Sequence, residues 1–459
     1  MTTDAPPARR ILPRTAAGLL LPAYALIFGL ILWIRRGSPQ SVTIEDRIEF
    51  SWLWGALFIG LALVYVLIHR HADRFPFRWL VAAYLVVSLL LLLMPVLLSS
   101  DIYVYAMRGR VLSVYHQNPY LVPPANFPED PFLGWTNPAW RGLTQNYGPL
   151  WTLFSALLTW IGGARLFGTV FLFKLSGFVG NTLGLWLVSR LTGDMEPKTR
   201  RAIIVLYAMN PLLLMEFVNN GHNDIWMVVL GLLALYFYRT KKDLWIVPAL
   251  VLAGLIKYVF WLLIPLFLVF LWREKRLHPK LMLGSGALSL ACLAAGYAPF
   301  WRGAATFSGV LGQSGIERPF NHYSPLPLML FLVMIARGRP LESLKSGLLV
   351  GRALFLAAYA KTLATARALD PAIVSVLIMF AFLGSATVLP WYVLWWLPFL
   401  ILGNRLRPVL FWSLVGMGGY LFLYSTTLSL AMVGGAYLVF LMTKEPGSSG
   451  SGERTILTS

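Results

Sequence analysis

A single carboxylate stands where a long apolar run gives way to polar residues. The run ends in LLSS, Asp101 follows, and aromatic and arginine residues then recur at helical spacing. On a helix over residues 101–115, one face would carry an acid, an aromatic shelf and a cation. The residues of this face are Asp101, Tyr105, Arg108, Leu112 and Tyr115. Such a face could belong to a functional site, although an interfacial helix whose arginines reach lipid phosphates explains the pattern too.

A second polar cluster, NNGHND at 219–224, lies between two apolar runs. Its donors and acceptors, among them His222, Asn223 and Asp224, could hold a sugar, a metal or a pyrophosphate. A turn rich in Asn and Gly uses the same residue types, but it needs neither the His nor the Asp. The His-x-Asp spacing supplies no third metal ligand. Glu216 lies one turn earlier in the sequence.

Two further groups could face an anion. Lys257 interrupts an apolar run, where it could pair with a phosphate or mark the outer turn of a hairpin. The stretch IERPFNHY adds Arg318, Asn321 and His322, which suit an anionic lipid headgroup or form a solvated loop.

The composition indicates the elements that must position these groups. The chain has 459 residues, of which 58% are hydrophobic and 12% charged, whereas soluble domains carry about 25% charged residues. Mean hydropathy is +0.69, and apolar runs recur at lengths suited to a hydrocarbon core of about 30 Å. The sequence therefore predicts an all-α, polytopic helical membrane protein. The net charge of +19 reflects Lys and Arg in short cytoplasmic connections and not a nucleic-acid partner.

The charge bias sets the predicted topology. It places the end of the third helix, and with it Asp101, at the outer face. Residues 101–147 form a long outer loop whose prolines exclude one long helix and whose aromatics favour order at the membrane interface. We expect helices near 15–34 (retained, not a cleaved signal), 52–69, 79–99, 149–161 (half-inserted), 166–190, 202–218, 225–238, 245–272 (a hairpin broken near GLIKY) and 281–298.

The remaining organisation is predicted more coarsely. The count between 326 and 370 stays open, and the total is roughly 11–14 crossings. Residues 1–443 form one transmembrane domain, and the Gly/Ser-rich tail 444–459 is expected to be disordered. The aromatics at 391–396 could line a groove for a lipid chain or form an interfacial belt.

Five stretches, taken in order, resemble a known family. They are DIYVYAMRGRVLSVYHQNPY, NYGPLW, NGHNDIWMVVLGLLALYF, LAGLIKYVFWLLIPL and LPWYVLWWLPF. The first two look like the first outer loop of GT-C integral-membrane glycosyltransferases. The order resembles that of bacterial polyprenyl-phosphate-mannose-dependent α-mannosyltransferases.

The resemblance implies a donor sugar on a polyprenyl monophosphate and a catalytic carboxylate in the first outer loop, here Asp101. Cations expected at the donor phosphate are Arg108, Lys257 and Arg318. Residues expected to bind sugar or acceptor are Tyr105, Asn118, Tyr147, His222, Asn223, Asp224, Asn321 and His322. One carboxylate with several cations suits an inverting transfer. A retaining mechanism would need a second carboxylate nearby, such as Glu129 or Asp130. No cofactor is required, and a divalent metal is possible but not favoured.

Two other classes compete with the glycosyltransferase. A transporter or flippase for lipid-linked sugars should carry charges at mid-membrane or broken helices in paired halves, whereas these polar groups gather at one face. A polymerase or ligase of lipid-linked sugars would have a similar sequence and another donor. The expected partners are the bilayer, the polyprenyl-phosphate sugar and a glycan or lipid acceptor, at the outer face of the bacterial cytoplasmic membrane. The sugar, acceptor and linkage stay open.

Overall fold

The computed structural model describes residues 20–35, 51–309 and 340–422. Within these ranges the chain is helical and forms no β-strand, apart from an isolated bridge between Arg302 and Ala304. The predicted all-α fold is therefore confirmed. The predictions for Arg318, Asn321, His322 and the tail 444–459 lie outside the described residues.

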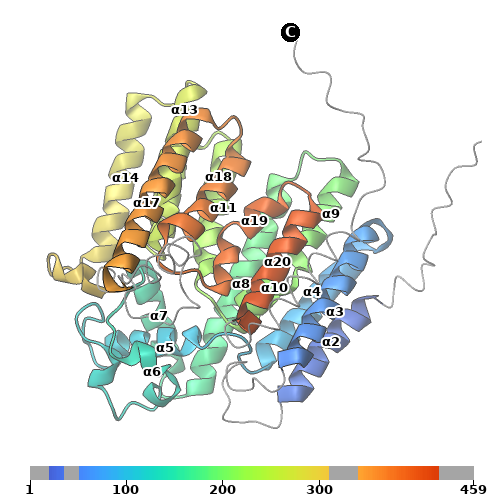
Figure 1. The fold of residues 1–459 in the computed structure, drawn as a ribbon, viewed down its shortest axis with the longest axis horizontal. Coiled ribbons are helices and arrows are strands. Elements are labelled where there is room, and N and C mark those ends of the chain that lie inside the picture. The colour runs from blue at the N-terminus through green and yellow to red at the C-terminus, as the bar shows by residue number, and fades with distance from the viewer. Residues whose placement is uncertain (1–19, 36–50, 310–339, 423–459) are drawn as a thin grey trace, which may run out of the picture.

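The first three helices pack together at one side of the molecule (Figure 1). They are α2 (Leu20–Arg35), α3 (Ser51–Arg70) and α4 (Phe77–Leu93). The third helix ends earlier than the predicted residue 99. Pro95 explains the difference, because a proline disfavours helical backbone at the residue before it, and Met94 is extended. Residues 94–100 therefore form a non-helical connection, called the strap below, that leads into Asp101.

The long loop is ordered around a short helix, α5 (Asp101–Ser113). It continues through η4 (Pro124–Asn126), η5 (Leu133–Trp135) and α6 (Pro138–Arg141) to α7 (Pro149–Gly162). The alternative of an interfacial helix whose arginines reach lipid phosphates does not describe α5, because every residue from Asp101 to Val111, Arg108 and Arg110 included, is buried. Helix α7 approaches α5 so closely that a Cβ on Gly109 would lie 2.6 Å from the Ser155 carbonyl oxygen.

The next helices form the centre of the molecule. Helix α8 (Leu166–Leu191) matches the predicted crossing. The single helix predicted at 202–218 is instead a bent pair, α9 (Pro197–Ala208) followed by α10 (Pro211–Leu213) and the π-helical η6 (Leu214–Asn219), with a bend of 41°. Pro211 explains the bend, because proline cannot continue the hydrogen-bond ladder of a helix.

The predicted hairpin is confirmed. After α11 (Asp224–Arg239) come η7 (Asp243–Trp245), α12 (Ile246–Gly254), η8 (Tyr258–Leu262) and α13 (Leu263–Arg273). Arg276 pairs with Asp243 at the open end of the hairpin, and Lys257 lies at its turn.

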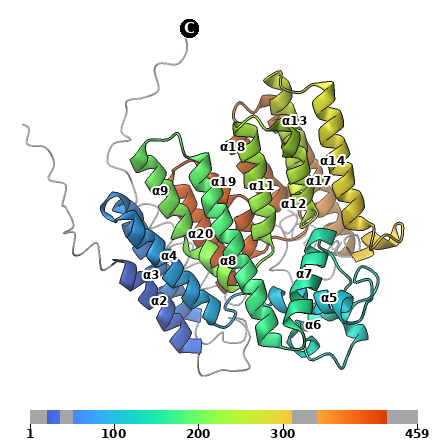
Figure 2. The ribbon, with the colours of Figure 1, turned by 180° about the vertical axis from the view of Figure 1, so that it is seen from behind.

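The remaining helices complete the bundle. They are α14 (Pro279–Tyr297), η9 (Ala305–Phe307), α17 (Pro340–Thr365), α18 (Leu369–Met379), η11 (Phe380–Gly384), η12 (Pro390–Trp395), α19 (Leu397–Ile401) and α20 (Leu406–Phe422). Seen from behind, α5, α6 and α7 gather at one end of the molecule, and α9, α13 and α18 lie toward the other (Figure 2).

Three described helices are long and apolar enough to cross a membrane, namely Leu166–Leu191, Pro279–Tyr297 and Ser346–Thr365. The bent pair ending at Asn219 is a fourth if it counts as one span. The other apolar helices are shorter. The total of 11–14 crossings stays a prediction.

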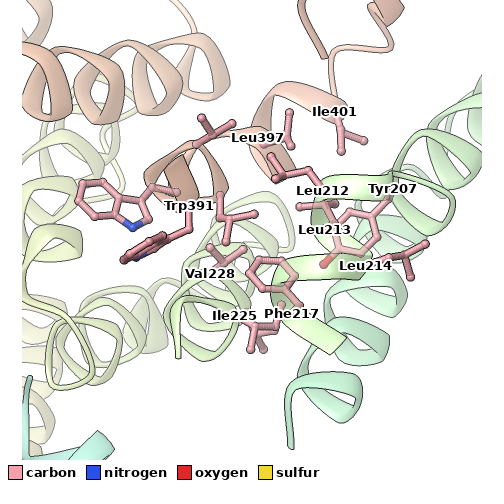
Figure 3. Close-up of a cluster of buried hydrophobic side chains, with 14 of the residues drawn as sticks. Tyr207, Leu212, Leu213, Leu214, Phe217, Ile225, Val228, Trp391, Leu397 and Ile401 are labelled. Carbon is pink, nitrogen blue, oxygen red and sulfur yellow. The ribbon is translucent and has the colours of Figure 1, made fainter. Parts of the chain in front are cut away.

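A buried apolar cluster joins the centre of the chain to its C-terminal part (Figure 3). Tyr207, Leu213 and Phe217 of the bent pair meet Val228 of α11 and Trp391 of η12 in this cluster. Burial of large apolar side chains contributes about 1.5–3 kcal/mol each. The cluster therefore fixes the turn between η6 and α11 against η12, and this turn carries the polar stretch 219–224.

Candidate active site

Asp101 begins α5, where a carboxylate is stabilised by the positive end of the helix dipole. It is 8% exposed. Its Oδ2 accepts hydrogen bonds from the Tyr105 hydroxyl at 3.3 Å and the Tyr147 hydroxyl at 3.4 Å. No described side chain donates to Oδ1.

The two phenols form an aromatic wall beside the carboxylate. Their rings meet edge to face at 5.3 Å, and the Tyr105 ring meets Trp151 in the same manner at 5.2 Å. Burial and the negative charge of Asp101 raise the pKa of both phenols well above the ordinary value. Tyr105 and Tyr147 therefore stay protonated and can donate hydrogen bonds throughout the neutral range.

The stretch 219–224 lies directly against this wall. Gly221 has a φ of +62°, a conformation that glycine adopts without strain, and the turn directs the next two side chains toward α5. His222 Nδ1 lies 3.3 Å from the Tyr105 hydroxyl, and Asn223 Oδ1 lies 3.4 Å from it. The structure therefore brings the two predicted clusters together.

His222 is completely buried among acids. Its Nε2 is 3.3 Å from Glu216 Oε2, its Nδ1 is 3.9 Å from Asp224 Oδ2, and Trp391 stacks on the ring at a centroid distance of 4.7 Å. Burial alone would lower the pKa of the imidazole, but Glu216, Asp101 and Asp224 together reverse that effect, and the pKa of His222 is raised.

Lys257 and Asp224 form an ion pair of 2.8 Å at the hairpin turn. Trp395 Nε1 donates to the same Asp224 Oδ1 at 2.6 Å. The Lys257 ammonium lies between 5.1 and 5.9 Å from the ring centroids of Tyr147, Tyr392 and Trp395, and its side chain is 16% exposed. Lys257 thus marks the turn of the hairpin, as one of the two interpretations predicted, and its pairing with a phosphate stays a prediction.

The strap is held by two asparagines of the bent pair. Asn219 accepts from the Leu97 N–H at 2.9 Å and donates to the carbonyls of Leu91 and Pro95 at 3.0 and 2.9 Å. Asn220 accepts from the Leu98 N–H at 3.1 Å. Buried backbone groups that leave a helix need such partners. The asparagines therefore fix the segment that leads directly to Asp101.

Arg108 is buried behind the wall, at 1% exposure. Its guanidinium donates to Asn146 Oδ1 at 2.6 Å and to Gln145 Oε1 and the Leu143 carbonyl at 3.3 Å each. Burial lowers its pKa, whereas Tyr147, Asp101 and Tyr105 raise it less strongly. Arg108 therefore contributes positive charge close to Asp101, Tyr105 and Tyr147. Both of its terminal nitrogens already donate hydrogen bonds within the protein.

Two predicted residues lie outside the cluster. Asn118 caps a local turn by accepting from the Tyr120 N–H, and it donates to the Phe300 carbonyl, each at 3.0 Å. Asp130 pairs with Arg110 at 2.8 Å in the buried part of the loop. Asp130 is thereby engaged away from Asp101, and Glu129 is exposed, so the described loop brings neither acid into contact with Asp101.

Glu216, Trp391 and Trp395 contact the site residues, although sequence reasoning gave them no site role. The dense aromatic run at 391–396 was the available signal, and two of its tryptophans face the polar cluster.

The described residues offer no metal site. No group of three His, Cys, Asp or Glu side chains in the described ranges is arranged to hold a metal ion, and Asp224 Oδ1 already accepts hydrogen bonds from Lys257 and Trp395. Metal independence remains a prediction.

The protein is a helical membrane protein, and a buried carboxylate, two phenols and a cation gather at the ends of its helices. This is the arrangement expected of a membrane glycosyltransferase. The family model described as alpha-(1->6)-mannopyranosyltransferase, N-terminal domain, matches residues 32–274. Since this match covers more than half of the chain, the protein belongs to that mannosyltransferase family. No individual curated protein matches the chain. The matched region includes Asp101, Tyr105, His222, Asp224 and Lys257.

Proposed function

We propose that this protein transfers mannose from a polyprenyl-monophosphate donor to a hydroxyl of a glycan or lipid-linked acceptor. The family description names an α-(1→6) product, which suggests the 6-hydroxyl of a mannose as the nucleophile. The observation that carries the proposal is the buried Asp101 carboxylate, whose Oδ2 is held by two phenols.

Asp101 acts as the general base in this proposal. A sugar hydroxyl is a weak nucleophile at neutral pH, and a carboxylate within hydrogen-bond reach can remove its proton as the new bond forms. The oxygen attacks the anomeric carbon while the bond to the phosphate breaks, so the configuration inverts. Because no second carboxylate in the described ranges contacts Asp101, a covalent sugar intermediate has no support. An α product then requires a β-linked donor.

Lys257 is the proposed partner of the donor phosphate. Charge builds on the phosphate as it departs, and a nearby ammonium stabilises that charge. Asp224 and the three aromatic rings hold the lysine in place, while its side chain keeps some exposure. Arg108 adds positive charge from behind. The sugar or acceptor would contact the aromatic wall and the polar side chains next to it, namely Tyr105, Tyr147, His222 and Asn223.

The polar cluster is proposed to face the outer side of the bacterial cytoplasmic membrane. Lys257 lies at the turn of its hairpin beside the site, whereas Asp243 and Arg276 pair at the opposite end. The exposed basic residues Lys241 and Lys242 follow α11 at that same opposite end. Basic connections stay in the cytoplasm, which supports an outward site.

Asp101→Asn tests the proposal in membranes supplied with radiolabelled polyprenyl-phosphate mannose and an α-mannoside acceptor. Loss of a general base should lower kcat about 10²- to 10⁴-fold, with protein amount and donor binding retained. Glu129→Gln, in the same loop but exposed, is the matched control and should keep full activity. Normal transfer by Asp101→Asn would refute the catalytic assignment, and a product with the donor's anomeric configuration would refute inversion.

A further inference from the structure

Four buried side chains lie in close succession from Asp101 to the centre of the protein. Asp101 Oδ2 lies 3.3 Å from the Tyr105 hydroxyl, which lies 3.3 Å from His222 Nδ1. On the other side of the imidazole, His222 Nε2 lies 3.3 Å from Glu216 Oε2. General base catalysis by Asp101 does not by itself require the last two members.

The hydrogen-bond roles along this series follow from the chemistry of its groups. A neutral imidazole carries one proton. If that proton is on Nε2, it faces the Glu216 carboxylate, and the free Nδ1 can accept the single Tyr105 proton when that proton turns away from Asp101 Oδ2. Asn220 donates to Glu216 Oε2 at 2.8 Å, which holds the carboxylate toward the ring. This tautomer leaves the phenol able to accept a proton on its oxygen as it gives one up.

We infer that Tyr105 and His222 form a proton relay that takes the acceptor's proton from Asp101. The inference rests on the proposed function. The acceptor hydroxyl gives its proton to Asp101 as its oxygen bonds to the anomeric carbon and the bond to the phosphate breaks. The protonated carboxyl group of Asp101 then turns its new proton toward the Tyr105 oxygen and passes it there, and Tyr105 passes its own proton to His222 Nδ1. Asp101 returns to a carboxylate, Tyr105 is unchanged, and His222 becomes an imidazolium.

The surroundings of His222 favour storage of this proton. Acids face the ring from three elements, with Glu216 on η6, Asp101 on α5 and Asp224 on α11. Lys257 acts against them, but it lies beyond Asp224 and is paired with it. Trp391 stacks on the ring without a charge. These acids raise the pKa of His222 despite its burial. The proton returns by the same route once the product leaves and water reaches Asp101.

Tyr105→Phe interrupts the relay and keeps the ring packing. The relay requires a neutral His222, so kcat of the wild-type protein should fall below a pH set by the raised pKa of this residue, above its ordinary value of about 6.5. In Tyr105→Phe the plateau of kcat should fall about 10-fold, the value for loss of one hydrogen bond to a charged group. The acid limb of its pH profile, which is the range where kcat falls as pH is lowered, should move to lower pH.

Tyr115→Phe is the matched control, because Tyr115 also donates to a carboxylate, Asp130, at 2.8 Å. This control should leave both the acid limb and kcat unchanged. A purely structural role for Tyr105 would lower activity without moving the limb. An acid limb at the same pH in the wild-type protein and in Tyr105→Phe would therefore overturn the relay.

A measurement without substrate separates the relay from the proposed function. ¹⁵N NMR of histidine-labelled protein follows the titration of His222 among six histidines. Asp101→Asn removes one of the acids that face the ring, so the pKa of His222 should fall. An unchanged pKa in this variant would overturn the coupling. Absence of transfer by the wild-type protein with every donor offered would instead refute the proposed function, whatever the NMR result.

Discussion

Replacing Lys257 by Met removes the partner of a carboxylate that has no contact with solvent. Asp224 is completely buried, and its Oδ1 lies 2.8 Å from the Lys257 ammonium. With an effective dielectric constant of about 20, charges at this distance attract by about 6 kcal/mol. The cost of removing both groups from water offsets most of this attraction. Loss of one partner nonetheless leaves a buried charge uncompensated, so Lys257→Met should lower the free energy of unfolding by about 3–5 kcal/mol.

The reciprocal change should cost less. Asp224→Asn keeps the volume of the side chain and the acceptor for the Trp395 N–H. The Lys257 ammonium that remains is partly exposed and faces three aromatic rings, each worth about 0.5–2 kcal/mol as a cation–π contact. We therefore expect a loss of about 1–2 kcal/mol. Adding Asp224→Asn to Lys257→Met removes the unpaired charge and should recover at least half of the stability lost in the single Lys257 variant.

Reversible unfolding in mixed micelles, followed by tryptophan fluorescence, measures these differences. Lys242→Met is the matched control, because Lys242 is exposed and its loss should cost less than about 0.5 kcal/mol. The rescued double variant should still have a raised KM for the donor if Lys257 faces the phosphate. Equal costs for Lys257→Met and Lys242→Met, or additive costs in the double variant, would refute the buried ion pair as the source of the effect.

Two further outcomes follow from the same cluster. Asn219→Ala leaves the carbonyls of Leu91, at the end of α4, and Pro95, in the strap, without their donor, and it leaves the Leu97 N–H only its longer contact of 3.3 Å with Asn220, at about 1–3 kcal/mol for each buried group left unsatisfied. It should lower both stability in the unfolding assay and kcat, whereas the exposed Asn126→Ala should change neither. The raised pKa of His222 means that its contribution to stability is complete below about pH 6.5 and is lost as pH rises through the pKa of the folded state. His222→Asn should therefore flatten the decline of unfolding free energy that begins as pH rises above about 6.5, and an unchanged decline would contradict this.

Local features of the sequence were sufficient for most of the helices and part of the site. Hydropathy identified α3 and α8, and the break at Lys257 was visible because a lysine interrupts an apolar run. Asp101 and the stretch 219–224 stood out because charged and amide residues are rare between apolar segments. In a membrane such residues carry a high cost, so their presence alone is informative.

Tertiary contacts could not be read from these local features. The Tyr105 hydroxyl contacts His222 across 117 residues of sequence, and Trp395 contacts Asp224 across 171. Nothing in the pattern near Trp395 separates a tryptophan of the interfacial belt from one that donates to a buried acid. The burial of α5 was missed for a related reason. Its Arg110 satisfies its charge with Asp130, which removes the need to reach lipid or water.

The site lies where helices end, and the bilayer explains why. A helix that stops frees backbone groups, which membrane proteins tolerate only where protein groups or water satisfy them. At the end of α4, Asn219 and Lys174 take the freed carbonyls, with Lys174 Nζ 2.8 Å from the Leu92 oxygen. Such ends therefore gather polar side chains, and a buried carboxylate such as Asp101 finds partners there. The same cluster supports the fold and the chemistry, so only isosteric variants such as Tyr105→Phe can separate the two.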